Sequence, residues 1–534
     1  MGNAAIQSDV ERIADVLVIG GGPAGTWAAL TAAAQGASVV LVDKGYCGTS
    51  GATAPSGTGV WYVEPTEEQQ EAAMKSREAL GGYLADRGWM KRVLNQTYAN
   101  MNDLALAGYP YSLDDEGQSY RRSLQGPEYM RLMRKRVKKA GVIIMDHSPA
   151  LELLADEHGV GGASGVRTET GETWTVKAGA VVIASGGCAF LSKALGCNVL
   201  TGDGYLIAAE AGASLSGMEF SNAYGISPTF ATVTKTAFYT WATFYYEDGS
   251  IIEGAGSQQG RSVIAHTLKT QPVYARLDRA TEEMQRWMRA AQPNFFLPFD
   301  RLGIDPFTQM FPVTLRLEGT VRGTGGIHLI DESCASAVPG LYAAGDAATR
   351  QFICGGFTGG GSHNAAWAMS SGYWAGEAAS AYATGLGSRS DRRELKGVSA
   401  QGSVSALAST DDVSEWVAAV KREVEPFDIN LFRTEATLNQ SLGRLNSLWR
   451  KVQHALAANA ADAVRLREAQ AMTATARWMY ASALARRESR GMHKRLDYPG
   501  TDDAQHYRIL TGGLNEVWVK PEAALHRTTE VHER

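Results

Sequence analysis

The stretch of residues 15–25 constrains the fold of this chain more than any other feature of the sequence. Residues 16–19, Val-Leu-Val-Ile, form a short and mostly β-branched apolar run, which is typical of a buried parallel strand. Gly20, Gly22 and Gly25 follow with the spacing G-x-G-x-x-G. In this pattern the first glycine permits a tight turn, the second lets a pyrophosphate approach the backbone, and the third lets the next helix pack close to the strand.

A helix and a second strand complete the pattern. The alanine-rich helix expected at about residues 24–35, with Pro23 and Ala24 at its start, would aim its first backbone N–H groups at a phosphate. Residues 38–43 are expected to form the second strand. It ends at Asp43, about twenty residues beyond the fingerprint, where a carboxylate can hold a ribose hydroxyl. The sequence therefore predicts a dinucleotide-binding domain, because a glycine-rich turn in another α/β protein would leave Asp43 unexplained.

Size and charge exclude several other classes of protein. The chain has 534 residues, enough for roughly two to four domains, and its formal charge of −5 is small for this length. Such a charge argues against nucleic acid or an anionic membrane as the main partner. No apolar run reaches the roughly 18 residues of a membrane span. The first residues lack the basic and apolar regions of a signal peptide.

The cysteines bear on metal sites and on the cellular compartment. None of them forms a C-x-x-C pair, so neither an iron–sulfur cluster nor a zinc site is expected, and we predict no metal. Scattered free thiols favour a reducing, cytoplasmic location over a disulfide framework. The five residues are Cys47, Cys188, Cys197, Cys334 and Cys354.

Changes in composition along the chain predict four parts. Residues 1–217 and 322–385 carry the nucleotide-binding patterns and are expected to form one discontinuous domain. Residues 218–321 are dense in aromatic residues and are expected to form an inserted second domain. Residues 406–490 have helical periodicity and many alanines, which predicts a helical domain. Residues 491–534 form a C-terminal tail.

Several short motifs, taken in order, resemble the flavoprotein family of fumarate reductase and succinate dehydrogenase. L-aspartate oxidase and the α subunit of adenylylsulfate reductase are relatives within this resemblance, which covers most of the chain without being close to any one member. The motifs are Ala-Ser-Gly-Gly at 184–187, Thr-Gly-Asp-Gly at 201–204, Gly-Leu-Tyr-Ala-Ala-Gly-Asp at 340–346, Glu-Ser-Arg-Gly-Met-His at 488–493 and Asp-Tyr-Pro at 497–499.

The resemblance implies both a fold and a cofactor. The fold would be α/β, with a Rossmann-like FAD-binding domain, an inserted α+β capping domain and a C-terminal helical domain. FAD would lie in an extended form, with Asp346 holding its ribityl chain. Many relatives attach FAD through a histidine in the loop that matches residues 50–57, and this chain has Gly51 there. We therefore expect FAD to be bound non-covalently.

The fingerprint and the resemblance together predict a set of residues that contact FAD. They come from the first strand–turn–helix unit, from the end of the second strand and the loop after it, and from the later motifs. The predicted residues are Gly20, Gly22, Pro23, Ala24, Gly25, Asp43, Lys44, Ser50, Gly51, Ala52, Gly57, Ala184, Ser185, Gly186, Asp203, Gly345, Asp346 and Ser362.

Arg261 is the first candidate for a catalytic side chain. Moving a hydride between a flavin and a carbon atom needs a substrate that lies flat over the ring, groups that hold its carboxylate or carbonyl, and a proton supplied or taken from the opposite side. In fumarate reductase relatives an arginine on the capping domain carries that proton, and the resemblance matches it to Arg261. The alternative is an arginine at a helix start in a surface ion pair.

Other parts of the dicarboxylate machinery differ from the family pattern. Ala223 or Tyr224 stands where one histidine is expected, and Val321, with Arg322 beside it, stands where a second is expected. Phe357 or Thr358 occupies the place of an arginine in the loop after Asp346. Because a phenylalanine cannot replace a guanidinium that grips a carboxylate, we do not expect succinate or fumarate as substrate.

Three further residues are candidates for catalysis, namely Tyr224, Arg322 and His363. Tyr224 could donate a hydrogen bond or act as an acid, or it could be a packed aromatic residue. His363 follows a glycine-rich run at a helix start that faces the flavin in relatives. The aromatic residues of the second domain suggest an apolar or aromatic substrate, although most of them could equally fill the core of that domain.

The leading functional hypothesis is an FAD-dependent oxidoreductase acting on a C–C or C–N bond of a small molecule next to an activating group. An alternative is a redox-neutral hydratase or lyase that uses reduced FAD on an unsaturated acid. A third is an FAD subunit of a redox complex with a ferredoxin-like or other electron-transfer partner. A second G-x-G-x-x-G on a strand is absent, so no NAD(P)H domain is expected. The sequence leaves open a homo-oligomer.

Overall fold

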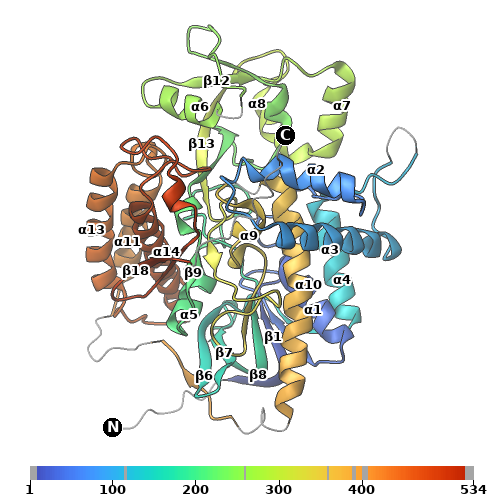
Figure 1. Ribbon diagram of the computed structural model, residues 1–534, viewed down its shortest axis with the longest axis vertical. Coiled ribbons are helices and arrows are strands. Elements are labelled where there is room, and N and C mark those ends of the chain that lie inside the picture. The colour runs from blue at the N-terminus through green and yellow to red at the C-terminus, as the bar shows by residue number, and fades with distance from the viewer. Residues whose placement is uncertain are drawn as a thin grey trace, which may run out of the picture.

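The computed structural model describes residues 9–113, 117–257, 260–357, 360–387, 393–399 and 407–522. At its centre lies a sheet of eight strands, in the order β16-β6-β7-β8-β1-β2-β5, with β15 also paired to β8 (Figure 1). The parallel strands are β1 (Val10–Ile19), β2 (Val39–Val42), β5 (Ile143–Met145), β8 (Thr173–Ile183) and β15 (Leu341–Ala343). The antiparallel strands are β6 (Ala150–Asp156), β7 (Gly159–Val166) and β16 (Lys396–Gly397).

The register of the parallel strands brings four chain segments to one edge of the sheet. Ile19 pairs with both Val42 and Ile183, and Ala343 also pairs with Ile183. These are the last residues of their strands, so the loops that follow them begin side by side. In open α/β sheets the edge formed by the carboxyl ends of the strands is where ligands bind.

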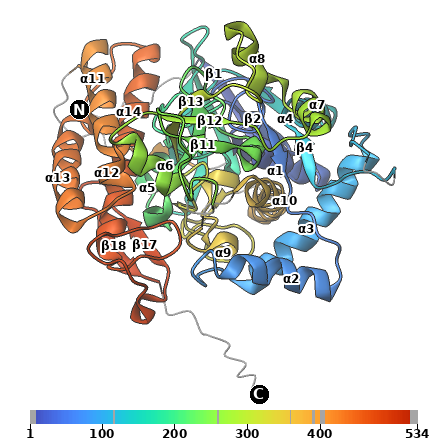
Figure 2. The same cartoon turned by 90° about the horizontal axis from the view of Figure 1, so that it is seen from above.

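Two helices pack tightly on one face of this sheet. They are α1 (Pro23–Ala34) and α10 (Gly360–Leu386), and Figure 2 shows α10 end-on beside α1. At Gly372 and Gly376 of α10 an added Cβ would lie 2.3 Å from a carbonyl oxygen of α1, so the close approach needs glycine there. The strand–turn–helix unit predicted from the fingerprint is thus present as β1 and α1.

The remaining helices of this part surround the sheet. In Figure 1 α2, α3 and α4 lie to the right of the sheet, while α5 packs on the other side against β6. The bounds are α2 (Glu67–Glu78), α3 (Arg87–Leu106), α4 (Gly126–Lys139), α5 (Asp203–Glu210), η3 (Gly345–Ala347) and α9 (Gln351–Cys354). A small antiparallel ribbon joins β3 (Gly57–Gly59) to β4 (Ser123–Gln125).

The region predicted as a capping domain lies above the central sheet in Figure 1. It is built on an antiparallel sheet in the order β10-β13-β12-β11, covered by helices, which is the α+β composition that the resemblance implies. Its elements are η1 (Met218–Phe220), β10 (Ala223–Pro228), η2 (Phe238–Trp241), β11 (Thr243–Tyr245), α6 (Gly260–Leu268), β12 (Val273–Arg276), α7 (Glu282–Ala291), α8 (Pro293–Leu302) and β13 (Phe311–Gly319).

The C-terminal part is helical, as predicted, and ends in a hairpin. Its helices lie at the left in Figure 1 and are α11 (Thr410–Val424), α12 (Phe427–Asn430), α13 (Glu435–Val452) and α14 (Ala460–Ala485). After η5 (Asp503–Gln505), the hairpin strands are β17 (Ile509–Gly512) and β18 (Trp518–Pro521). They extend a sheet with β9 (Leu215–Ser216) and β14 (Gly326–Ile327), in the order β14-β9-β17-β18. β9 and β14, which flank the inserted region in the sequence, pair with each other, and the tail joins them through β9.

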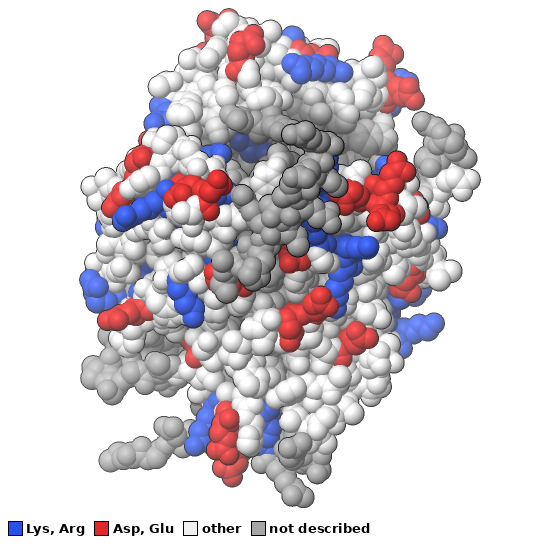
Figure 3. Space-filling model, viewed as in Figure 1, with Lys and Arg blue, Asp and Glu red and all other residues white. Residues whose placement is uncertain are grey.

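The surface and the helices give two further facts. Figure 3 shows acidic and basic side chains interspersed over the visible face, in keeping with the small net charge. Within the described ranges, none of the helices has the length and apolar character needed to cross a bilayer.

Candidate active site

A large cavity lies where the carboxyl edge of the central sheet meets the capping region. Its volume is about 890 Å³. This is near the upper end of the roughly 300–1,000 Å³ that small-molecule sites occupy, so the cavity can hold a large ligand. Residues directly after β1, β2, β8 and β15 form its floor, and residues of α6 and α7 line it from the capping region.

The three glycines of the fingerprint have different surroundings. Gly20 has a φ of +112°, and a Cβ there would lie 2.3 Å from the carbonyl oxygen of Ala184. At Gly25 a Cβ would lie 1.7 Å from the carbonyl oxygen of Gly20, so this glycine serves the close packing of helix and strand. Gly22 has nothing within 4 Å of its Cβ position and lines the cavity. The open side at Gly22 fits a phosphate at the uncapped start of α1.

Asp43 joins two loops at the floor of the cavity. Its Oδ2 accepts a hydrogen bond from the backbone N–H of Gly21 at 2.5 Å. Its Oδ1 accepts from the N–H of Gly45 at 2.8 Å and from Ser50 Oγ at 2.7 Å. A carboxylate has about four acceptor positions, so Asp43 retains capacity for a ribose hydroxyl.

Lys44 and Asp203 both line the cavity and form an ion pair. Lys44 Nζ lies 2.7 Å from Asp203 Oδ2 and 2.6 Å from Glu468 Oε1, which belongs to α14. It also donates to Thr201 Oγ1 at 2.9 Å. These contacts tie the loop after β2 to the start of α5 and to the helical region.

All residues predicted to contact FAD line the cavity except Gly25, which is packed behind Gly20. Two of them show how the pocket fits a ligand. Ser185 Oγ is buried and has no hydrogen-bond partner in the described part of the chain. The Asp346 carboxylate forms an ion pair with Arg350. Burial raises the pKa of Asp346, and the charge of Arg350 acts in the opposite direction. An unsatisfied hydroxyl and an ionisable carboxyl at a cavity wall fit the polar chain of a dinucleotide.

Arg261 lines the cavity from α6. In the described part of the chain its side chain makes no hydrogen bond or ion pair. Burial lowers its pKa to about 10, the charge of Arg322 lowers it further, and Glu318 acts against both. Arg261 is therefore still protonated at neutral pH and offers an unpaired guanidinium to whatever occupies the cavity.

Arg322 also lines the cavity, but the protein provides its counter-charge. Its Nη1 lies 3.1 Å from Glu318 Oε2, and Lys235 Nζ lies 3.3 Å from Glu318 Oε1. Thr234 Oγ1 donates to the same carboxylate at 2.8 Å. Although burial acts to raise the pKa of Glu318, the charges of Arg322 and Lys235 outweigh it and the pKa is lowered. Glu318 thus remains ionised between two cations.

His363 lies near the start of α10 and lines the cavity with 3% of its surface exposed. Its ring packs against Trp61, with the ring centroids 4.4 Å apart. The structure therefore brings Arg261, Arg322 and His363 to one cavity, together with the predicted nucleotide residues.

Comparison with known proteins identifies relatives of this chain. Residues 15–224 match a model described as an FAD binding domain, and residues 425–528 match a model described as the fumarate reductase flavoprotein C-terminus. The chain is 25% identical to a fumarate reductase flavoprotein subunit of Mycobacterium tuberculosis, over 93% of this chain and 94% of that protein. It is 28% identical to an L-aspartate oxidase of Mycobacterium bovis, over 94% and 96%.

The chain contains the FAD binding domain and the C-terminal domain of fumarate reductase flavoproteins, and its homologues include fumarate reductase flavoproteins and L-aspartate oxidases. Its cofactor is FAD, and it is an FAD-dependent oxidoreductase. The fold agrees. A mutant E. coli quinol fumarate reductase superposes with a TM-score of 0.82 at 20% identity, covering 97% of this chain and 98% of the other. The adenylylsulfate reductase of Archaeoglobus fulgidus superposes with a TM-score of 0.76 at 18% identity, covering 97% and 98%.

One predicted catalytic residue of this flavoprotein is not brought to the cavity. The hydroxyl of Tyr224 donates to the backbone carbonyl oxygens of Val424 at 3.1 Å and Glu425 at 3.0 Å, and its ring packs against Phe427. Burial raises its pKa beyond the usual range of a tyrosine. Tyr224 joins the capping region to the helical region, and this position removes it from the catalytic candidates.

The aromatic residues of the capping region divide into two groups. Phe295, Phe299 and Phe311 are fully buried, with ring centroids 4.7 to 5.3 Å apart, and form its core. Phe238 and Trp287 line the cavity, with ring centroids 6.1 Å apart. The density of aromatic residues in the sequence therefore reports mainly on the core of this region.

Three charged residues at or beside the cavity escaped prediction from the sequence. Lys235 and Arg77 line it, and Glu318 lies behind Arg322. Arg77 stands in a helix rich in charges, where an arginine is usually solvated. Glu318 and Lys235 come from separate elements, so no spacing in the sequence connects them. Phe357 lines the cavity, whereas Thr358 lies outside the described residues.

Proposed function

We propose that this flavoprotein transfers a hydride between the N5 atom of FAD and a carbon of a small, anionic organic substrate. The reacting bond is a C–C or C–N bond next to a carboxylate or carbonyl group. The observation that carries the proposal is Arg261, an unpaired guanidinium that lines the cavity beside the predicted nucleotide residues. The Arg261 side chain is exposed toward the cavity, so its charge is available to an anionic ligand there.

The residues after the parallel strands are assigned to the cofactor. Gly22 and the start of α1 receive the pyrophosphate, Asp43 the ribose, and Asp346 with Ser185 the chain toward the ring. FAD, when bound, supplies the site that accepts or donates the hydride. We propose that it is held without a covalent bond, because Gly51 stands in the loop where relatives carry a linking histidine. Acid precipitation that leaves the yellow colour in the supernatant supports this, and flavin that stays with the denatured chain contradicts it.

Arg261 serves the substrate in two ways. Its N–H groups donate a proton to the carbon next to the one that exchanges hydride, or take one in the opposite direction, and its charge stabilises a developing carbanion. Arg322 also lines the cavity and adds positive charge there, and its ion pair with Glu318 holds it in place. His363, braced by Trp61, is the second candidate for proton transfer.

Succinate and fumarate are not the preferred substrates in this proposal. Val321 and Phe357, two of the residues that replace charged or polar ones of the family pattern, both line the cavity. An apolar side chain cannot bind a carboxylate at that place. The substrate therefore carries its anionic group toward other cations of the cavity.

Anaerobic mixing tests the proposal. Oxidised and reduced protein are mixed with a panel of saturated and unsaturated acids, amines and ketones while the flavin absorbance is followed. We expect reduced flavin to be reoxidised by at least one unsaturated acid, with one flavin oxidised per product. Many turnovers after one reduction would instead indicate a redox-neutral hydratase or lyase. Failure of every compound to change the flavin would overturn the proposal.

We also propose a separate electron-transfer partner. The relative from Mycobacterium tuberculosis is named as the flavoprotein component of a fumarate reductase, and another from Methanothermobacter marburgensis is likewise named as one component of a fumarate reductase. Within the described residues no group of histidine, cysteine and acidic side chains is arranged to hold a metal ion. Isolation of the protein from its native cells, followed by analysis of co-purifying iron–sulfur proteins, tests this part. A homo-oligomer and the cytoplasmic location remain predictions.

A further inference from the structure

Arg77 is a second unpaired arginine of the cavity. It stands in the last turn of α2 and lines the cavity. Its Nε is buried without a hydrogen-bond partner, and no ion pair holds its guanidinium in the described part of the chain. Lys75 of the same helix is exposed and does not line the cavity. Of these two cations of α2, only Arg77 lines the cavity.

Arginines that this fold buries for its own stability are treated differently. All three nitrogens of the Arg433 guanidinium donate hydrogen bonds, to Asn430, the carbonyl oxygen of Glu219 and His493. Arg486 is likewise satisfied at all three nitrogens. A buried N–H without a partner is costly, so proteins retain one mainly where a ligand completes it.

The backbone fixes where Arg77 stands. Its carbonyl oxygen accepts from the N–H of Gly81 at 3.1 Å, and the carbonyl oxygen of Gly81 accepts from the N–H of Gly356 at 2.8 Å. The N–H of Met492 in turn donates to the carbonyl oxygen of Gly356 at 2.7 Å. The end of α2 is thus held against the segment that leads to Phe357, which lines the cavity.

The charge of Arg77 also reaches this segment. Burial raises the pKa of the Cys354 thiol to about 12, and the positive charges of Arg350 and Arg77 oppose that rise. The phosphate site assigned above lies elsewhere, at Gly22 and the start of α1. Arg77 belongs to a part of the cavity wall built from α2 and the segment after α9, whereas the pyrophosphate is assigned to the unit of β1 and α1.

We propose that Arg77 binds the carboxylate of the substrate, which then lies between Arg77 and Arg261. This inference rests on the proposed function and names its substrate class, a flat unsaturated carboxylic acid. The Arg77 guanidinium can grip a carboxylate through two parallel N–H···O hydrogen bonds. Arg322 is less suited to that task, because Glu318 already meets its charge. Arg261 is left free for proton transfer at the reacting carbon.

Crotonate and crotonamide test the inference, because they share one shape and differ in charge. Each is titrated into the oxidised, FAD-loaded protein, and binding is followed by the change in flavin absorbance. We expect the wild type to bind crotonate at least about 10-fold more tightly than crotonamide. Arg77→Gln should weaken crotonate binding about 10- to 100-fold and leave crotonamide binding nearly unchanged. Arg77→Lys should fall between, because it keeps the charge and loses the planar fork.

Lys75→Gln is the matched control, since it removes a cation of the same helix that lies outside the cavity, and it should bind crotonate as the wild type does. FAD content and thermal stability are measured for every variant, and Arg77→Lys carries the test where Arg77→Gln does not fold. Wild-type affinity for crotonate in Arg77→Gln, or no preference of the wild type for crotonate, overturns the inference. Loss of FAD from Arg77→Gln also overturns it, because Arg77 would then serve the cofactor. Binding that follows the expected pattern without flavin reoxidation by any acid overturns the proposed function instead.

Discussion

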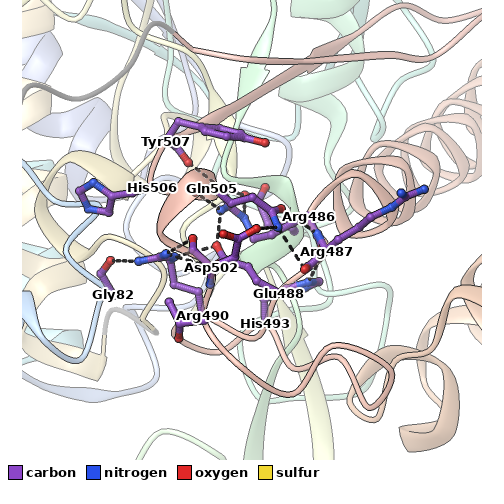
Figure 4. A network of polar contacts seen from close by, with 12 residues as sticks. Gly82, Arg486, Arg487, Glu488, Arg490, His493, Asp502, Gln505, His506 and Tyr507 are labelled. Carbon is purple, nitrogen blue, oxygen red and sulfur yellow. Dashed lines mark hydrogen bonds and ion pairs between the residues drawn. The ribbon is translucent and has the colours of Figure 1, made fainter.

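The segment from Arg486 to Arg490, which leads from α14 into the C-terminal tail, and the cavity both contain arginines, but the surroundings of these arginines differ. In this segment, whose ion pairs we call the tail network, Arg486 and Arg490 lie on either side of Glu488 (Figure 4). Arg486 Nη1 lies 2.8 Å and Arg490 Nε 2.7 Å from Glu488 Oε1, and Glu219 meets Arg486 from the other side at 2.9 Å. In the cavity, Arg77 and Arg261 have no such partners in the described part of the chain.

Arg486 and Arg490 support the fold through their ion pairs, whereas we infer that Arg77 and Arg261 bind a ligand. Arg490 also donates to the carbonyl oxygen of Gly82 at 2.7 Å, so the tail network joins the C-terminal region to the loop after α2 (Figure 4). His493 lies within the same network, and burial, followed by the charges of Arg433 and Arg486, lowers its pKa well below the usual value. The protein keeps this histidine neutral and gives its arginines carboxylates. Of the cavity arginines, Arg322 is paired with Glu318, whereas Arg77 and Arg261 have no carboxylate partner in the described part of the chain, which is the arrangement expected of a binding site.

The largest effect is expected from breaking the tail network. Glu488→Ala leaves Arg486 and Arg490 as buried cations without their shared carboxylate. Removing one partner of a buried ion pair costs about 3–5 kcal/mol. The free energy of unfolding of the FAD-loaded protein, measured in urea, should fall by about this amount. Glu253→Ala removes an exposed glutamate and is the control. An unchanged urea midpoint in Glu488→Ala would show that the network does not support the fold.

The next largest effect concerns Arg261 and should leave the fold intact. Arg261→Gln removes the unpaired cation, so stability should stay within about 0.5 kcal/mol of the wild type or rise. Turnover of the most reactive acid of the panel should fall about 10²-fold, roughly 2.7 kcal/mol in activation free energy. Arg261→Lys keeps the charge but loses the planar fork, and it should be less impaired. Turnover within a few-fold of wild type in Arg261→Gln would mean that Arg261 has no part in the chemistry, and Arg322 and His363 would be tested next.

A smaller effect is expected at Asp43 and Asp346, the carboxylates that we assign to FAD, because both also have partners in the protein. Asp43→Ala and Asp346→Ala should each weaken FAD binding about 10- to 100-fold, since a hydrogen bond to a charged group contributes about 1.5–3 kcal/mol. Asp346→Ala should also lower stability, because Arg350 loses its carboxylate. Fluorescence titration of the apoprotein with FAD measures both affinities. Unchanged affinity in both variants would show that the nucleotide has been misplaced.

The parts of the fold that sequence predicts well are those encoded in consecutive residues. The fingerprint places β1, α1 and Asp43 correctly because strand, turn and helix follow one another, and the register of β1, β2 and β8 then assembles the later motifs at one edge. Tyr224 could not be placed this way. Its hydroxyl partners, Val424 and Glu425, lie 200 and 201 residues further along the chain. Its packing therefore depends on how two regions meet.

The cavity cations show the same limit. Nothing in the sequence of α2 distinguishes Arg77 from Lys75, because the direction of a side chain depends on how the helix is docked against Gly356 and the tail. Glu318 and Arg322 are four residues apart, yet the third member of the cluster, Lys235, comes from the other end of the capping region. Ion-pair clusters built across elements require the tertiary structure, whereas a contiguous glycine motif does not.

The smallest effect is expected from pH. Burial and then the neighbouring charge of Arg322 lower the pKa of Arg261 to about 10, below the ordinary value of an arginine. Because the proton donor is the protonated guanidinium, kcat/KM in the direction of substrate reduction should be constant from pH 7 to about 9. It should fall as the pH rises through about 10, approaching tenfold for each further pH unit. The neutral range should therefore show almost no dependence on this group.

The profiles of the complex and of a variant sharpen this expectation. A bound carboxylate stabilises the charged guanidinium, so the limb of kcat, which reports on the complex, should lie at higher pH than the limb of kcat/KM, which reports on the free enzyme. Arg261→Lys places an ammonium at the same position of the cavity wall. Its ordinary pKa of about 10.4 is below that of arginine, and burial lowers it further, so the kcat/KM limb should move to lower pH. Stopped-flow reoxidation of the reduced flavin between pH 6 and 11 measures both profiles. If the pH limb of Arg261→Lys stays where it is in the wild type, another group is responsible for the titration. Arg261 would then not be the proton donor, and its contrast with the paired arginines of the tail network would lose its functional meaning.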